Sequence, residues 1–209
     1  FDFPCIFPDK DGLHKITQGP IGKQLLDKLD SKGIVGLAYW DNGFKIFSSN
    51  KPVKAPADFK GQKLRIQSSK VLDAQMRSLG AIPQVMAFSE VYQALQTGVV
   101  DGTENPPSNM YTQKMYEVQK YANISNHGYL GYAVIVNKKF WEGLPADVRA
   151  GLDKAMKEAT DYANEVASKN NEDALAAMKA SGKTEFFQPT TAERDALCKA
   201  MQPVYDQMG

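Results

Sequence analysis

The 209-residue sequence contains only two cysteines and two histidines, and its charges nearly cancel. Twenty-five Lys and Arg residues against 24 Asp and Glu residues leave a formal net charge of +1. Nucleic-acid-binding domains usually show a clear basic excess, so this balance argues against a nucleic-acid partner. No apolar run approaches the roughly 20 residues of a membrane-spanning helix, which argues against direct insertion into a membrane.

Sequence motifs for catalysis are also absent. The sequence contains no GxSxG, HExxH, P-loop or GxGxxG pattern. His14 and His127 lie far apart, and an isolated histidine beside a glycine-rich strand is more often structural than catalytic. A metal site would need a denser group of His, Cys and carboxylate side chains. We therefore expect no catalytic residue, no metal and no cofactor.

The two cysteines, Cys5 and Cys198, have neither metal-ligand spacing nor a CxxC arrangement. Two independent thiols, buried or half-buried, are the favoured interpretation, and a disulfide is the alternative. Neither interpretation identifies the cellular compartment.

Short apolar runs alternate with amphipathic helical stretches, which predicts an α/β architecture. The chain is long enough for one domain or two small ones. The spacing of apolar residues predicts strands over 34–39, 43–49 and 62–67, and helices over 19–31, 68–80 and 89–97.

The second half of the chain has a different pattern, with one strongly apolar segment and one long helical segment. Residues 129–137 form its most apolar strand, which we expect to be central. A long helix should begin after Pro145 and run to about Ser181, where Gly182 ends it. A short strand and a last helix with a Thr190–Glu193 capping box should follow.

Arg65 is the most informative single residue. It lies within an apolar strand, just before the loop that enters a helix, where open α/β sheets place ligand-binding groups. Its guanidinium can bind a carboxylate through two parallel hydrogen bonds. The alternative is an exposed edge-strand arginine or a structural ion-pair partner.

Three other residues have two interpretations each. Lys45, between Phe44 and Ile46, is either a second positive charge near a site or part of a solvated strand face. Trp40 either lines a pocket or is a partly buried structural residue. Phe88 lines a site or acts as a hydrophobic staple at a helix start.

Residues 88–105 combine a helix, a left-handed stop at Gly98, a strand of two valines and a polar turn. Asp101 and Glu104 could act as a general base in an enzyme, but we interpret both as structural groups of the turn. Asn105 precedes a proline, which restricts its backbone. Its amide could orient a carboxylate or hydroxyl, and the alternative is an ordinary helix N-cap.

Three segments carry a family resemblance: KGQKLRIQSSK, GAIPQVMAFSEVYQALQTGVVDGTENP, and MYEVQKYANISNHGYLGYAVIVNKKFWEGLPADVR with the long helix after it. Together they resemble the solute-binding subunits of TRAP transporters, in the branch that binds four-carbon dicarboxylates. The similarity covers essentially the whole chain, and DGTENP is its most specific part.

The resemblance implies a bacterial periplasmic protein with a two-lobe periplasmic binding protein fold, chain crossovers and a long spanning helix. The lobes would close on an organic acid and deliver it to the membrane permease subunits. By analogy, residues 1–42 and 131–170 belong to the first lobe, and residues 43–130 and 171–209 to the second.

The resemblance also implies roles for individual residues. Arg65 corresponds to the carboxylate-clamping arginine, Asn105 to the orienting asparagine and Phe88 to the aromatic that lines the site. Lys45 occupies a second basic position that is often arginine in other branches. A lysine is a point charge, so we expect a looser or water-mediated contact there.

The sequence departs from the family in one respect. Because the chain opens on Phe1 without a methionine, we expect a processed or trimmed N-terminus. Family members carry further βα units before a stretch that resembles the opening FDFP, so the resemblance implies an incomplete first lobe. A fragment is the favoured explanation, and a natural minimal variant is the alternative. The main functional expectation is capture of succinate, malate or fumarate without catalysis. The alternatives are a related module for another organic acid or an ectoine-like solute, and an α/β enzyme acting on organic acids.

Overall fold

The computed structural model describes all 209 residues, which form two compact units. Unit 1 comprises Phe1–Ile6, Gly43–Leu130 and Asn170–Gly209, and unit 2 comprises Phe7–Asn42 and Gly131–Lys169. The expected division placed residues 1–42 together in the first lobe. In the structure Phe1–Ile6 belongs to unit 1. Cys5 attaches this segment there, because it is bonded to Cys198 and donates its backbone N–H to the carbonyl of His127.

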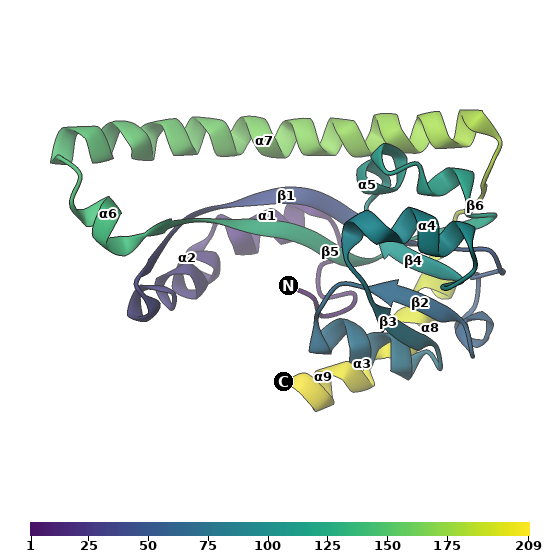
Figure 1. Ribbon diagram of the computed structural model, residues 1–209. Coiled ribbons are helices and arrows are strands. Elements are labelled where there is room, and N and C mark those ends of the chain that lie inside the picture. The colour runs from purple at the N-terminus through teal and green to yellow at the C-terminus, as the bar shows by residue number, and fades with distance from the viewer. The chain divides into compact units, whose positions relative to one another are not determined.

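A six-stranded mixed sheet runs in the order β3-β2-β4-β1-β5-β6 (Figure 1). The strands are β1 (Ile34–Ser49), β2 (Lys63–Ile66), β3 (Ile82–Val85), β4 (Gly102–Asn105), β5 (Tyr121–Asn137) and β6 (Glu185–Phe187). Strand β2 is parallel to both β3 and β4, and β5 is parallel to β6, whereas β1 is antiparallel to β4. The expected α/β architecture is confirmed.

Strand β1 corrects the prediction of two strands over 34–39 and 43–49, because the chain runs through both without a turn. The sequence pattern predicts that a second strand begins at Gly43. A Cβ atom there would lie 2.5 Å from Nδ2 of Asn171, so the glycine allows a close approach instead of a break.

Helices cover both faces of the unit 1 sheet (Figure 1). Helices α3 (Lys70–Ser78), α8 (Thr191–Met201) and α9 (Pro203–Met208) lie on one side, and α4 (Val91–Gln96) and α5 (Pro107–Thr112) lie on the other. Each side has its own apolar cluster, with Leu72 and Leu197 in one and Val91 and Met110 in the other. Short 3₁₀ turns complete the unit at Pro56–Phe59, Phe88–Glu90 and Met115–Glu117.

The ends of two helices in unit 1 agree with the capping patterns of the sequence. Ser69 caps α3, and Gly80 ends that helical segment with φ 74°. Thr190 and Glu193 form the expected capping box at α8. The stretch after Gly98 differs, because Val99 and Val100 are not a strand, and β4 begins only at Gly102.

Unit 2 contains α1 (Lys10–Thr17), α2 (Pro20–Asp27), a 3₁₀ turn at Asp30–Lys32, α6 (Lys138–Glu142) and the first part of α7 (Ala146–Ser181). The predicted long helix is confirmed, whereas the helix predicted over 19–31 already ends at Asp27. Helix α7 is bonded to β1 through Thr160 and Asn164. No helix is both long and apolar enough to cross a membrane.

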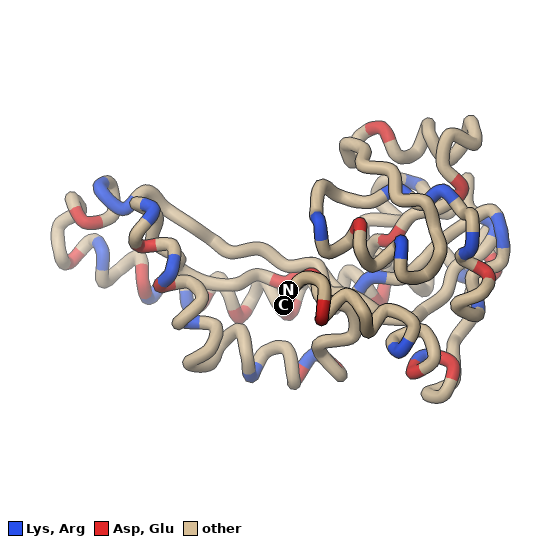
Figure 2. The backbone as a smooth tube through the Cα atoms, turned by 90° about the horizontal axis from the view of Figure 1, so that it is seen from below, with Lys and Arg blue, Asp and Glu red and all other residues tan.

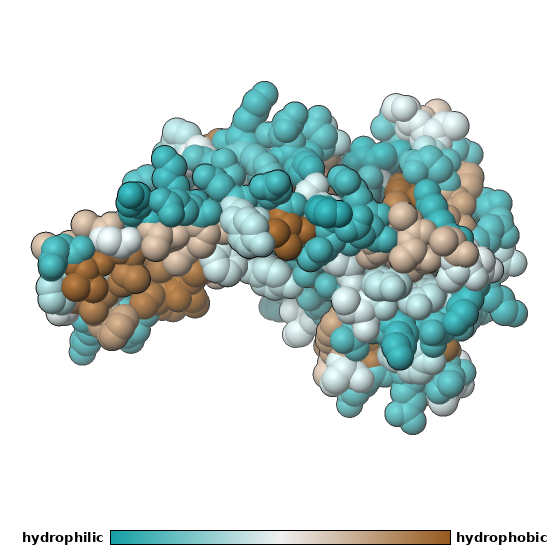
Figure 3. Space-filling view, turned by 90° about the horizontal axis from the view of Figure 1, so that it is seen from above, coloured by the Kyte–Doolittle hydropathy of each residue, from teal (hydrophilic) through white to brown (hydrophobic).

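The apolar segment 129–137 is not the buried central strand that was expected. Within unit 2 this part of β5 leaves Tyr132 50% and Ile135 53% exposed. Apolar residues gather on one part of the surface of unit 2 (Figure 3). Lys and Arg residues are interspersed with Asp and Glu residues along the backbone of each unit (Figure 2), as expected from the small net charge.

A disulfide between Cys5 and Cys198 corrects the expectation of two free thiols. The two Cα atoms lie 5.9 Å apart although the residues are 193 positions apart in the chain. Spacing in the sequence could not show this, because the fold brings the N-terminal segment onto α8. The Tyr205 hydroxyl also donates to the carbonyl of Pro4 at 2.6 Å.

Removing this disulfide should destabilise the protein strongly. In the chain-entropy account, a loop of about this length contributes roughly 5 kcal/mol, and losses of about 2–5 kcal/mol are typical. We expect the double variant Cys5→Ser, Cys198→Ser to lose a free energy of unfolding in this range in urea titrations. A reductant should shift the wild-type transition and leave the double variant unchanged. Equal transitions for wild type and variant would contradict the structural role.

Candidate functional site

The carboxyl ends of three parallel strands meet at one edge of the unit 1 sheet. Arg65 lies near the end of β2, Asn105 is the last residue of β4, and Phe88 follows β3 by three residues. Ligands of open α/β sheets bind outside the carboxyl ends of the strands. The candidate site is therefore built at this edge.

Strand register places Arg65 and Asn105 on the same face of the sheet. Arg65 pairs with Thr103 across β2 and β4, and side chains two positions apart on one strand share a face. Glu104 lies on the opposite face, beside Phe47 of β1, which also carries Lys45 two residues earlier. The two basic residues thus project from opposite faces of the sheet.

Arg65 is buried but has no anionic partner. Only 3% of the residue's surface is exposed to solvent, and Nε donates to the carbonyl of Met86 at 3.0 Å. No other hydrogen bond or ion pair engages the guanidinium. Burial lowers the pKa of Arg65, and the negative charge of Glu104 partly offsets that effect. Two terminal nitrogens remain available for an anion.

The ring of Phe88 lies next to this guanidinium, with the Arg65 Cζ atom 5.7 Å from the ring centre. This distance is within the range of cation–π attraction. Phe88 itself is 36% exposed, so part of its ring faces solvent. The pair places an apolar ring beside a cationic guanidinium.

Asn105 is 6% exposed, and its Nδ2 donates to Oγ1 of Thr103 at 3.2 Å and approaches Sδ of Met115 at 3.5 Å. The N-cap position of α5 is occupied by Pro106, so Asn105 is not the helix cap that was the alternative interpretation. The contacts fix the amide at the end of β4, on the face that carries Arg65.

A buried ionic network lies on the other face of β4. The carboxylate of Glu104 accepts from Nζ of Lys45 at 2.5 Å and from Nε2 of His127 at 2.7 Å. The Nε2 of Gln75 lies 3.4 Å from the same carboxylate. Lys45 is 2% exposed and its ammonium is bound to Glu104, so it has no open path to solvent.

Electrostatics keep Glu104 ionised in this interior. Burial alone would raise the pKa of the carboxyl, but Lys45 and His127 outweigh it and lower that pKa to about 2. Burial also lowers the pKa of His127, although the bond to Glu104 works against this. His127 is therefore neutral near pH 7, with Nε2 protonated because a carboxylate only accepts, and Nδ1 accepting from the Ser125 hydroxyl at 2.7 Å.

Three other residues noted in the sequence have hydrogen-bond partners of their own, and the pocket-lining role of Trp40 stays a prediction. Trp40 belongs to unit 2, where its indole nitrogen donates to Thr160 at 2.9 Å. His14 bonds to Asp41 at 2.5 Å. Asp101 accepts from the backbone of Lys63 at 2.8 Å, which fits a structural role.

Glu104 was interpreted as part of a turn, but it lies inside a strand, and the participation of His127 was missed. The polar residue Lys45 between two apolar neighbours was the only sequence signal for this network. No group of three or more His, Cys, Asp or Glu side chains could hold a metal ion.

The whole chain, residues 1–209, matches the family described as bacterial extracellular solute-binding protein, family 7. It is 69% identical over 208 residues to the C4-dicarboxylate-binding periplasmic protein DctP of Rhodobacter capsulatus, covering 100% of this chain and 62% of that protein.

Two solved structures of TRAP periplasmic solute-binding proteins have the same fold. One from Shewanella oneidensis with bound succinate has a TM-score of 0.95 at 41% identity, covering 99% of this chain and 68% of that one. One from Pseudomonas aeruginosa PAO1 with bound L-malate has a TM-score of 0.94 at 36% identity, covering 99% and 72%. The chain thus spans about three fifths of the length of the Rhodobacter protein.

The buried neutral histidine should make stability depend on pH. Its folded pKa lies below the ordinary 6.5, so below about pH 6.5 the unfolded chain binds a proton that the folded chain does not. As the pH falls below about 6.5, the free energy of unfolding should therefore decrease by up to about 1.4 kcal/mol for each pH unit. Glu104 adds stability that is present above its ordinary pKa of 4.5 and is lost as the pH falls toward 2.

The variant His127→Gln retains an N–H donor toward Glu104 but does not titrate. Urea titrations between pH 7.5 and 5 should show a shallower loss of stability for this variant than for wild type. His14→Gln is the matched control, and it should retain the part of the pH-dependent loss of stability that His127 causes. Parallel pH profiles for wild type and His127→Gln would refute the assignment of His127 as a buried neutral group.

Proposed function

Because this chain belongs to family 7 of the bacterial extracellular solute-binding proteins, we propose that it captures a four-carbon dicarboxylate in the periplasm. Succinate, malate and fumarate are the candidate ligands. The observation that carries the proposal is the guanidinium of Arg65, which is buried at the carboxyl ends of the parallel strands without an anionic partner. An unpaired buried cation is costly, so its retention favours binding of an anion.

Arg65 binds one carboxylate of the ligand through its two terminal nitrogens. Such fork-to-fork pairs select a planar anion in one orientation, which a lysine cannot do. Asn105 orients the same end of the ligand from the neighbouring strand, on the same face of the sheet. Phe88 contacts the carbon chain through the exposed part of its ring.

Lys45 contributes in a different way from the contact that the family resemblance implied. Its ammonium is bound to Glu104 and shielded from solvent, so it acts on the ligand through the charge that it supplies to the buried network. Counting Arg65, Lys45 and Glu104, the buried side chains carry one net positive charge. A carboxylate that binds Arg65 therefore enters a positive environment.

The protein is a carrier and not an enzyme, as the family consists of solute-binding proteins. We propose that it passes its ligand to the membrane permease subunits of a TRAP-type transporter. The similar proteins with bound succinate and L-malate support a dicarboxylate as the ligand. A sugar acid or another organic acid is the competing outcome, which a ligand panel distinguishes.

Substitution of Arg65 should abolish tight binding. Loss of one partner of a buried, hydrogen-bonded charge pair costs about 2–5 kcal/mol, which is roughly 30-fold to 4,000-fold in affinity. We expect Arg65→Gln to weaken binding of the preferred dicarboxylate by this range in calorimetry on the intact protein. Arg65→Lys keeps the charge but loses the fork, so its affinity should lie between those of wild type and Arg65→Gln.

Arg77→Gln is the matched control, because Arg77 is an exposed arginine that pairs with Asp73 on its own helix. Its affinity should equal that of wild type. The panel should contain succinate, malate, fumarate, a hexuronate and a monocarboxylate. An Arg65→Gln variant that binds within twofold of wild type would exclude Arg65 as the clamp, and a preference for hexuronate would replace the proposed ligand class.

A further inference from the structure

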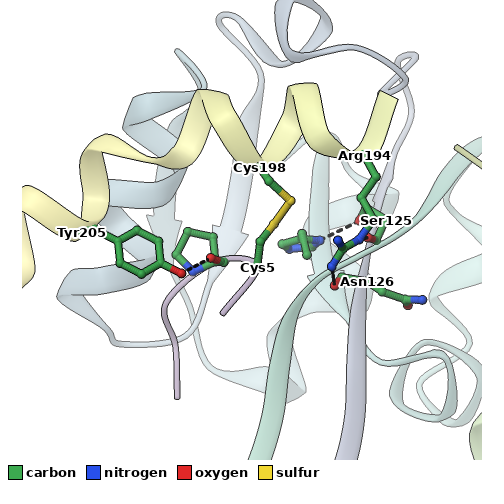
Figure 4. The surroundings of a disulfide bond; sticks show 8 residues. Cys5, Ser125, Asn126, Arg194, Cys198 and Tyr205 are labelled. Carbon is green, nitrogen blue, oxygen red and sulfur yellow. Dashed lines mark hydrogen bonds between the residues drawn. A yellow bond between two sulfur atoms is a disulfide. The ribbon is translucent and has the colours of Figure 1, made fainter. Parts of the chain in front are cut away.

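Three consecutive carbonyl groups of β5 accept hydrogen bonds from groups outside the strand. Arg194 of α8 donates through Nε to the carbonyl of Ser125 at 3.0 Å and through Nη2 to that of Asn126 at 3.2 Å (Figure 4). The backbone N–H of Cys5 donates to the carbonyl of His127 at 2.7 Å. Residues 125–127 are thus anchored from both the N-terminal segment and α8.

The two anchors are joined by the disulfide. Arg194 and Cys198 are four residues apart on α8, a spacing that places both on one face of the helix. The bond to Cys198 fixes Cys5, whose N–H contacts β5, and the Tyr205 hydroxyl fixes Pro4 beside it (Figure 4). Helix α8 therefore reaches β5 directly through Arg194 and indirectly through Cys5.

The anchored segment has a backbone that is unfavourable without support. Asn126 has φ 46° and Cys5 has φ 56°, both in the left-handed region that residues with a Cβ seldom adopt. Such conformations persist where surrounding contacts determine them. Asn126 directly precedes His127 on β5, and we call residues 125–127, with their left-handed residue, the β5 bend.

His127 connects this bend to the candidate ligand site. Its ring is 0% exposed, stacks on Phe47 at a centroid distance of 3.7 Å, and bonds to Glu104 at 2.7 Å. Glu104 immediately precedes Asn105 on β4, and its charge acts on Arg65. A change in the bend would therefore alter the group that balances the clamp arginine.

We propose that the Cys5–Cys198 disulfide and Arg194 are positioning elements of the ligand site, which hold the β5 bend so that His127 reaches Glu104, and that ligand affinity consequently depends on the redox state of the disulfide. This inference rests on the proposed function, because its readout is dicarboxylate affinity. Both cysteines are half-buried residues.

A dithiol reductant supplies the chemistry that tests this dependence. One of its thiolates attacks a sulfur of the disulfide, the other protein sulfur leaves as a thiolate, and the second thiol of the reductant resolves the mixed disulfide. The protein gains two electrons and two protons, and the reductant leaves as its own disulfide. Cys5 is then free of α8, and the anchor on the carbonyl of His127 is weakened.

The first test measures the Kd for succinate of the intact protein by calorimetry, before and after reduction by dithiothreitol and alkylation of the thiols. Circular dichroism checks that the reduced protein is folded at the temperature used. The second test uses oxidised Arg194→Gln, whose disulfide is intact, so that it does not depend on the stability of the reduced form. Arg77→Gln is the matched surface control. NMR of the assigned His127 ring reports its environment, with the His14 ring as an internal reference.

We expect reduction to weaken succinate binding about tenfold, and Arg194→Gln to weaken it severalfold, with a shift of the His127 ring signals and unchanged His14 signals. Arg77→Gln should change neither quantity. If oxidised wild type binds succinate and both perturbations leave the Kd within twofold and the His127 signals in place, the positioning role is wrong while the proposed function stands. If oxidised wild type binds no C4-dicarboxylate, the proposed function fails, and this inference fails with it.

Discussion

The hydrogen bonds from Lys45 and His127 to the carboxylate of Glu104 are the interaction on which unit 1 depends most. An ionised carboxylate in the interior is costly unless donors surround it. The ammonium and the imidazole supply those donors, and the carboxyl pKa falls to about 2 as a result. This charge sits in the strand next to Arg65 and makes the burial of a second cation tolerable.

Burial of Arg65 without a direct partner follows from that arrangement. Glu104 influences the guanidinium from the opposite face of the sheet and does not bond to it, so the terminal nitrogens stay available. The carbonyl of Met86 and the ring of Phe88 fix the orientation of the fork. A site prepared in this way loses little side-chain entropy when an anion binds, which favours affinity.

Local patterns predicted much of this molecule, and long-range contacts account for what they missed. The long helix α7, the cap at Thr190 and the α/β architecture follow from spacing and capping rules that act over a few residues. The disulfide and the Glu104–His127 bond join positions far apart in the chain, which no local pattern reveals. Strand alternation suggested a solvated face for Lys45 because it could not show that helices cover both faces of the sheet.

The placement of Arg65 at the carboxyl ends of the parallel strands was predictable from its strand, whereas its lack of an anionic partner could be seen only in the structure.

A crystal structure of the intact protein with succinate tests most directly the central claim that Arg65 binds a ligand carboxylate. The account predicts two distances of about 2.7–2.9 Å from Nη1 and Nη2 of Arg65 to the oxygens of one ligand carboxylate. A bound ligand whose carboxylates both lie beyond hydrogen-bond reach of Arg65 would contradict it.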